Sequence, residues 1–350
     1  MSAVAPVAGT VTYEEPTVTY EELLERARAG RLGPDPATLR IAVAFVTRQA
    51  VRHDGRGTGY RNEVLSLRLA GAVGSCAVEP GTLPDAAIDD CVGADVARLL
   101  DHPLLPVRVA ALDAYLMHVR PHTPENGARP FALPAGTSLE KSRARARAVV
   151  ELLDLPPGAI VLVVGVVNSL LEALRSQGLR YVPCDLKGGI TEWGEEVVTD
   201  APDAAERCDA LLVSGMTLSN GSFEPLRRHA LSYGKQLVMF AQTGSAVLPR
   251  FLGHGVSAVC AEPYPFFWLD AGAGTLHRYR RDDAHSAPAV DPAARPAVDP
   301  TVRPTADPAG GRTADPVAGP TAGSPVDPAA GSPVGSPVVT TAALAPGVGR

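Results

Sequence analysis

Three charged residues follow a short apolar run in residues 181–196, YVPCDLKGGITEWGEE: Asp185, Lys187 and Glu192. The carboxylates of Asp185 and Glu192 can transfer protons as a general acid or base, or bind a cation. Lys187 is one of three lysines in the chain and can balance the charge of an anionic substrate. We therefore take these three as candidate catalytic residues, with a solvated surface turn as the competing interpretation.

A divalent metal is one ligand that this segment could hold. Glu195 and Glu196 lie close to Glu192 in the sequence, and with Asp185 they offer hard oxygen ligands. Cys184, directly before Asp185, would favour a softer metal. Runs of charge more often face solvent, so the sequence defines no set of metal ligands and the metal stays unknown.

A nucleoside cofactor is the alternative ligand. Asp185 follows Gly165 by about 20 residues, the separation at which dinucleotide-binding folds place an acidic residue on a ribose. The segment VVGVVNSL has one glycine where the pyrophosphate-binding pattern G-x-G-x-x-G has three, which argues against NAD. S-adenosylmethionine has no pyrophosphate and does not need those glycines, so it is the nucleoside that we expect if one binds.

Five short apolar runs are the elements that would position these residues, and each is typical of a buried strand. The runs lie at residues 159–165, 180–184, 209–215, 235–241 and 256–261. Strands that alternate with helical segments predict a mainly parallel sheet. We therefore expect a five-stranded, Rossmann-like α/β domain over residues 137–283.

The carboxyl ends of these runs are the expected ligand-binding edge, because open parallel sheets bind ligands there. Small and polar residues follow each run, and several could equally be helix caps. The candidate ligand-binding residues are Gly165, Asn168, Gly215, Thr217, Asn220, Gly221, Gln242, Thr243, Gly244 and Ser245.

Residues 17–125 have a different hydrophobic pattern, with the period-2 alternation of half-buried strands near residues 60–71 and helical segments after them. This order predicts a smaller α+β domain. A Pro/Gly-rich connection over residues 121–136 separates the two predicted domains. A capping box at Thr137 then opens a helix to about Leu153, whose basic run SRARARA we interpret as solvent-facing.

Composition limits the classes of partner. A net charge of −6 argues against nucleic acid, and no apolar run is long enough to predict a membrane span. Five scattered cysteines are typical of reduced thiols, so we expect a cytoplasmic protein. Residues 1–16 are predicted to be a flexible arm, and residues 284–350, rich in Pro, Ala and Gly, a disordered tail.

Two segments resemble a known family. The run DALLVSGMTLSNGSFEPLRRHA is similar to the third-strand segment of the “Putative heavy-metal chelation” family, and GADVARLLDHPLLPVRVAALDAYL resembles its N-terminal domain. The family's T-L-x-N-G motif corresponds here to Thr217, Leu218, Asn220 and Gly221. The resemblance implies an enolase-N-terminal-like α+β domain, a Rossmann-like domain and a site in the cleft between them. The segment AQTGSAVLP departs from the family's usual loop after the fourth strand, which leaves the ligand open.

The sequence thus predicts a protein that binds a polar metabolite or a metal chelate in an interdomain cleft. A nucleoside-cofactor enzyme and a non-catalytic carrier are the alternatives, so whether the chain is an enzyme stays open. The expected partner is a small molecule rather than nucleic acid or a membrane, and a homo-oligomer is not excluded.

Overall fold

The computed structural model describes residues 19–57 and 59–281. The predicted arm at residues 1–16 and the predicted tail at residues 284–350 lie outside the described residues. Among the helices of the described part, none has the length and apolarity that a membrane crossing requires. The described strands form two sheets, one with three strands and one with seven.

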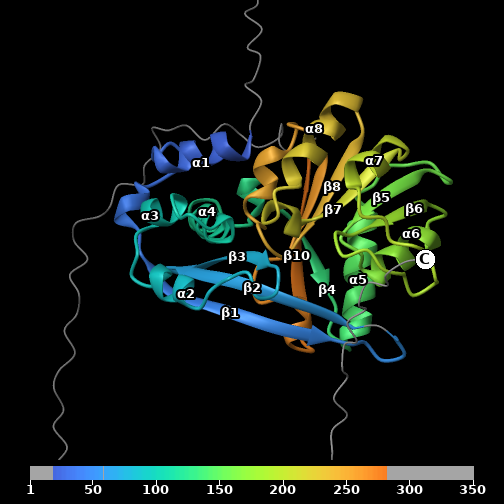
Figure 1. Cartoon of the computed structure of the whole chain (residues 1–350), viewed down its shortest axis with the longest axis horizontal. Coiled ribbons are helices and arrows are strands. Elements are labelled where there is room, and N and C mark those ends of the chain that lie inside the picture. Colours follow the sequence, from blue (N-terminus) through green and yellow to red (C-terminus); the bar gives the residue numbers. More distant parts are fainter. Residues whose placement is uncertain (1–18, 58, 282–350) are drawn as a thin grey trace, which may run out of the picture. The chain divides into compact units, whose positions relative to one another are not determined.

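The smaller sheet is an antiparallel meander, as the alternating sequence predicts. Its strands are β1 (Ile41–Val51), β2 (Tyr60–Leu69) and β3 (Ala72–Val78). Figure 1 shows β1 and β2 as long strands whose connecting hairpin reaches toward helix α5, which belongs to the larger sheet's layer. This hairpin therefore brings residues of the first half of the chain next to the second half.

Four helices accompany this sheet: α1 (Tyr20–Arg28), α2 (Ala86–Cys91), α3 (Val96–Leu100) and α4 (Leu105–Val119). Helix α4 packs directly on β3, where a Cβ on Gly74 would lie 1.9 Å from the backbone nitrogen of Ala114. The close approach of strand and helix therefore requires glycine at this position.

The larger sheet contains the five predicted parallel strands: β5 (Ile160–Val164), β6 (Arg180–Cys184), β7 (Ala210–Ser214), β8 (Gln236–Ala241) and β9 (Ala258–Ala261). Their spatial order is β6-β5-β7-β8-β9, so the direction of winding reverses between β5 and β7. In such a sheet, ligands bind at the carboxyl ends of the strands beside this reversal. The predicted mixed α/β fold with a mainly parallel sheet is confirmed.

Two antiparallel strands extend this sheet beyond the prediction. Strand β10 (Gly274–Arg280) pairs with β9, and β4 (Arg129–Leu133) pairs with β10 at the edge. Residues 129–133 lie in the predicted Pro/Gly-rich connection, and Pro130 is compatible with a strand because β4 is an edge strand.

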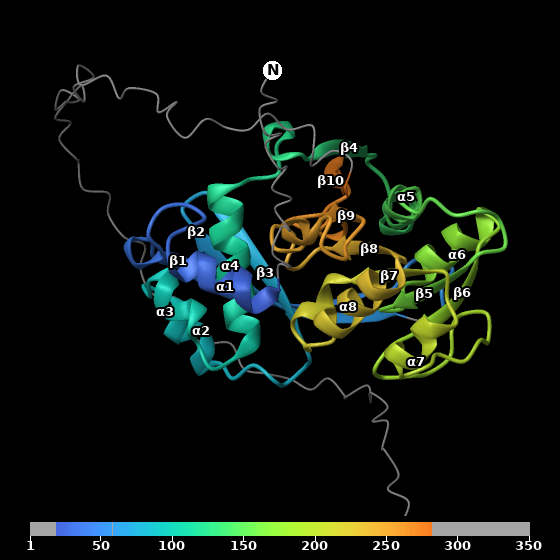
Figure 2. The same cartoon turned by 90° about the horizontal axis from the view of Figure 1, so that it is seen from above.

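Helices cover both faces of the larger sheet (Figure 2). Helices α5 (Ser138–Val150) and α6 (Asn168–Ser176) lie on one face, and α7 (Ala201–Glu206) and α8 (Phe223–Tyr233) lie on the other. Short 3-10 helices occur at Pro36–Thr38, Pro124–Asn126, Gly215–Leu218, Leu248–Phe251 and Phe267–Leu269. Alternate side chains of β5 enter different cores: Val161 and Val163 pack with α5 and α6, whereas Leu162 packs on the opposite side.

The turn after β8 connects the two sheets. The backbone N–H of Gly244 donates to the carbonyl of Ser75 on β3 over 2.8 Å. Asp113 on α4 accepts from the backbone N–H groups of Ser75, at 2.9 Å, and Ala246, at 2.7 Å. Both sheets belong to one compact unit, and the domain boundaries that the sequence predicts stay predictions.

Candidate functional site

A cavity of about 790 Å³ lies at the carboxyl ends of the parallel strands. Its walls come from the ends of β5, β6, β7 and β8, from the β1–β2 hairpin and β3, and from α5. Phe240, Phe266, Phe267 and Trp268 add an aromatic wall. The indole N–H of Trp268 donates to the side-chain oxygen of Gln49 on β1, which holds this wall against the smaller sheet.

Most of the candidates from the sequence surround this cavity. Those that line it are Gly165, Asp185, Lys187, Gly215, Thr217, Asn220, Gln242 and Thr243. Those outside its lining are Asn168, Glu192, Gly221, Gly244 and Ser245. Most residues chosen because they follow the carboxyl ends of strands therefore line the cavity. Their catalytic and binding roles stay predictions.

Asp185 and Lys187 form a tight turn at the mouth. One carboxylate oxygen of Asp185, Oδ1, accepts the backbone N–H of Lys187 at 3.0 Å. The Lys187 ammonium lies 2.9 Å from the Glu79 carboxylate at the end of β3. The side chains of Lys187 and Glu79 are 60% and 40% exposed, so solvent screens this ion pair strongly.

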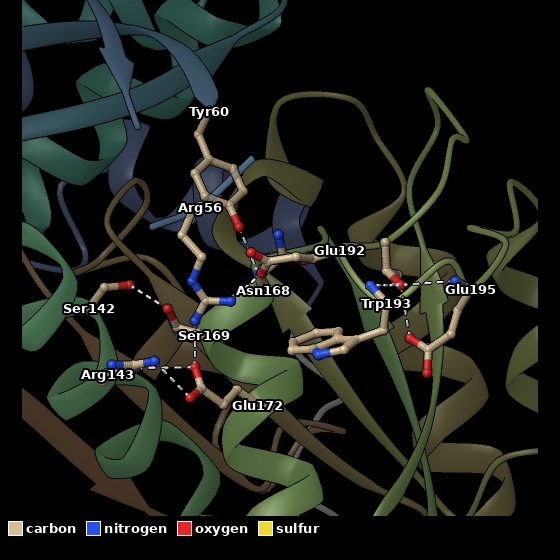
Figure 3. Close-up of polar contacts among 11 residues, drawn as sticks. Arg56, Tyr60, Ser142, Arg143, Asn168, Ser169, Glu172, Glu192, Trp193 and Glu195 are labelled. Carbon is tan, nitrogen blue, oxygen red and sulfur yellow. Dashed lines mark hydrogen bonds and ion pairs between the residues drawn. The ribbon is translucent and has the colours of Figure 1, made fainter. Parts of the chain in front are cut away.

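The Glu192 carboxylate forms an ion pair with an arginine from the β1–β2 hairpin (Figure 3). Arg56 pairs with Glu192 and, at 2.5 Å, with Glu172 on α6. Arg143 on α5 binds the same Glu172 carboxylate at 3.0 Å. This network ties the hairpin to the larger sheet, so the carboxylate of Glu192 serves a structural contact.

The carboxylates after β6 do not converge. Glu195 accepts hydrogen bonds from the hydroxyl groups of Tyr181 and Thr191, away from the Glu192 network. Burial raises the pKa of the Cys184 thiol to about 11, which keeps it protonated at neutral pH. No group of three or more His, Cys, Asp or Glu side chains that could hold a metal ion occurs in residues 19–57 and 59–281. The residues here therefore do not fit a resident metal ion.

His53, at the end of the hairpin's first strand, lines the cavity and was not among the predicted residues. Its Nδ1 lies 2.9 Å from the Ser138 hydroxyl at the start of α5. Burial lowers the pKa of His53, and the positive charges of Arg56 and Arg143 lower it further, so the ring is neutral at neutral pH. Within the described part of the chain its Nε2 has no partner, which leaves that nitrogen for a ligand.

Arg145 is the second functional candidate that the sequence did not reveal. The run SRARARA was expected to face solvent, but Arg145 is only 5% exposed and lines the cavity. Ser138, Ser142 and Arg145 share one face of α5 because they lie at positions i, i+4 and i+7. The expectation was wrong for Arg145 because this face is covered by the rest of the cavity wall, whereas Arg147 is exposed as expected.

Glu262, directly after β9, holds Arg145 in place. Its Oε2 accepts from Arg145 Nε at 2.8 Å and from the Gln242 amide at 3.0 Å, and its Oε1 accepts the Phe267 N–H at 2.6 Å. Burial raises the pKa of Glu262, and the charge of Arg145 and the other donors act against that rise. The Arg145 guanidinium carbon also lies 5.7 Å and 5.8 Å from the ring centroids of Phe240 and Phe267.

Residues 148–261 match the model of the family described as “Putative heavy-metal chelation”. The family resemblance is confirmed. The part that matches this heavy-metal chelation family begins in α5 and ends with β9. Arg145 and Glu262 flank it on either side, and His53 lies far outside it, so the match does not cover these three side chains.

Two solved structures of proteins of unknown function from the same family are similar to this chain. The protein from Desulfitobacterium hafniense DCB-2 is 15% identical, with a TM-score of 0.45 over 70% of this chain and 87% of that one. The protein from Pyrococcus horikoshii is 15% identical, with a TM-score of 0.41 over 68% and 86%. No curated protein matches the sequence significantly.

Proposed function

We propose that the chain binds a small polar organic molecule, or a metal chelate of one, in the strand-end cavity. The observation that supports this most is the cavity itself, which has about 790 Å³ and opens at the carboxyl ends of the parallel strands. Small-molecule sites span roughly 300–1,000 Å³ and combine apolar walls with a few polar groups. Gln242, Thr243 and Asn220 supply such groups here.

A chelate is compatible with this site because it brings its own metal ligands. The described residues gather no set of three metal-binding side chains, so the protein would recognise the organic shell rather than the ion. The description of the matched family supports the same ligand class. If the bound molecule reacts, Asp185 is the best placed of the predicted catalytic residues, with Lys187 beside it at the mouth, because Arg56 already occupies Glu192.

A nucleoside such as S-adenosylmethionine is the second candidate. The backbone N–H of Gly165 donates to the Cys184 carbonyl at 2.9 Å, which brings Gly165 and Asp185 to the same end of the cavity. Among the described residues, Oδ2 of Asp185 has no partner, so it can accept a ribose hydroxyl. This arrangement supports a nucleoside without a pyrophosphate.

Native mass spectrometry of the full chain tests the main proposal through a molecule that co-purifies. Asn62→Trp on β2 should displace it by filling the cavity, whereas Arg68→Trp, an exposed position farther along the same strand and outside the cavity lining, should retain it. Retention of the same molecule by Asn62→Trp would contradict the proposal. So would a chain that carries nothing and gives no heat with any of the titrants below.

Isothermal titration separates the two ligand classes. The titrants are S-adenosylmethionine, Ni²⁺ and the Ni²⁺–citrate complex, each added to the full chain. If a nucleoside binds, Asp185→Asn should weaken S-adenosylmethionine at least tenfold, and Asp89→Asn, an exposed change on α2, should have no effect. Equal binding by both variants would exclude Asp185 from a ribose site, and binding of the citrate complex but not free Ni²⁺ would favour the chelate.

A further inference from the structure

We propose that the ligand of this cavity is an organic acid whose carboxylate binds the two Nη groups of Arg145. The inference rests on the proposed function, because it names the substrate class of the same cavity. It is carried by Arg145, Glu262 and the two aromatic rings beside them.

Arg145 has hydrogen-bonding capacity that the protein leaves unused. Its side chain is 7% exposed and lines the cavity. Only Nε has an acceptor, the Glu262 carboxylate at 2.8 Å, and neither Nη has one among the residues that the structure describes. Neither Nη is among the fully buried unpaired atoms of the described residues, so both open on the cavity, where an acceptor from a ligand can reach them.

Lys141 shows how the same helix satisfies a buried cation that needs no ligand. It lies one turn before Arg145 and is 1% exposed. Its ammonium donates to the carbonyls of Gly272, at 2.6 Å, and Asp270, at 3.1 Å, and to the Asp270 side chain at 3.3 Å. The three donors of Lys141 thus meet three acceptors, whereas the Nη groups of Arg145 open on the cavity.

The Arg145 guanidinium is also held in a fixed orientation. Glu262 is itself fixed by the Phe267 N–H and the Gln242 amide, and the rings of Phe240 and Phe267 flank the guanidinium carbon. A planar guanidinium whose Nη1–Nη2 edge is free matches the two oxygens of a carboxylate or phosphate. Glu262 already compensates the single positive charge of Arg145, so each negative charge on a ligand is left uncompensated, and a monoanionic carboxylate costs less to bind than a dianionic phosphate.

The separation between His53 and Arg145 indicates a length for the acid. Ser138, which contacts His53, and Arg145 are seven residues apart on α5, or about 10 Å along the helix axis. An acid of about that length could place its carboxylate on Arg145 and a hydrogen-bonding group near Nε2 of His53. Phe266 and Trp268 line the space with the two flanking phenyl rings, which suits a planar or apolar body.

Titration of the full chain with benzoate and with inorganic phosphate tests the inference. We expect benzoate to bind more tightly than phosphate, and Arg145→Met to weaken benzoate at least tenfold. Arg145→Lys, which keeps the charge but loses the planar fork, should be intermediate. Arg147→Met, an exposed change on the same helix, is the matched control and should bind benzoate as the unaltered chain does.

A second measurement needs no variant. Phenylglyoxal modifies accessible arginine side chains, and peptide mass spectrometry should show Arg145 modified in the unaltered chain and protected when benzoate is present. Equal benzoate affinity in Arg145→Met and the unaltered chain would overturn the inference. Modification of Arg145 that benzoate does not slow would overturn it too, and tighter binding of phosphate would overturn the choice of a carboxylate.

Failure of this inference can be told from failure of the proposed function. If benzoate and phosphate do not bind but Asn62→Trp still displaces a co-purified molecule, the cavity is a binding site for another class of ligand. If Asn62→Trp displaces nothing and no probe binds, the proposed function fails with the inference.

Discussion

The two ends of the cavity differ in the exposure of their ion pairs. At the mouth, Lys187 pairs with Glu79, and both side chains are largely in solvent. At the inner end, Arg145 pairs with Glu262, and their side chains are 7% and 5% exposed. Exposed pairs are screened and flexible, whereas a buried pair keeps its geometry because separating it exposes an uncompensated charge to an apolar interior.

This difference bears on which charge can select a ligand. Lys187 is the more visible cation, but solvent competes for every contact that it makes. Arg145 is only 7% exposed, and its partner engages only one of its three nitrogens. A cation that is buried, oriented and only partly used discriminates between ligands better than one that is exposed.

The largest effect is expected from breaking the inner pair. Glu262→Leu removes the acceptor for Arg145, Gln242 and the Phe267 N–H together. Loss of one partner of a buried ion pair costs about 3–5 kcal/mol, so the free energy of unfolding should fall by that amount in urea denaturation followed by circular dichroism.

Two further variants serve as controls for Glu262→Leu. Glu79→Gln, which breaks the exposed pair at the mouth, should cost less than about 1 kcal/mol. The double variant Arg145→Met, Glu262→Leu should recover part of the lost stability, because an apolar pair leaves no charge buried alone, although the Phe267 N–H and the Gln242 amide still lack their acceptor. Equal losses of unfolding free energy in Glu262→Leu and Glu79→Gln would contradict the difference between the buried and the exposed ion pair.

A smaller effect is expected from the hairpin network. Arg56→Met removes the partner of Glu192 and one of the two partners of Glu172, which keeps Arg143. Hydrogen bonds to charged groups contribute roughly 1.5–3 kcal/mol, so we expect a loss of about 2 kcal/mol in the same denaturation experiment. Benzoate affinity should stay within about twofold, since Arg56 does not line the cavity; a tenfold loss would mean that the hairpin, rather than Arg145, controls binding.

The smallest effect concerns pH. Burial lowers the pKa of His53 below the ordinary 6.5, and the charges of Arg56 and Arg143 lower it further, so most His53 rings are neutral at pH 7 and above. Benzoate affinity should therefore change little in titrations between pH 8 and pH 7. A rise in affinity as the pH falls across this range would instead indicate that a protonated histidine holds the acid.

Apolar patterning was sufficient to predict the framework of the fold. The five parallel strands are continuous apolar runs that end at small or polar residues, and each forms where expected. Strand β10 was missed because only Leu276 and Tyr279 of its seven residues are buried. Strand β4 was missed because Pro130 is typical of a connection unless an edge strand is available to accept it.

The site was predictable only as far as strand ends determine it. Asp185 and Gln242 line the cavity because they follow strands whose carboxyl ends meet. Arg145 resembles its solvated neighbour Arg147 in sequence, and its burial depends on Glu262, 117 residues away. His53 enters the cavity only because the β1–β2 hairpin reaches Ser138. Contacts over such separations leave no local pattern in the sequence.

The aromatic wall has a spectroscopic consequence. The chain has two tryptophans, Trp193 and Trp268. Trp268 lines the cavity, whereas Trp193 is 39% exposed outside the lining and lies against the Arg175 guanidinium. A ligand that fills the cavity changes the surroundings of one indole and leaves the other in water. The emission of Trp268 is thus an intrinsic reporter of occupancy, and the iodide-quenchable emission of Trp193 is its internal reference.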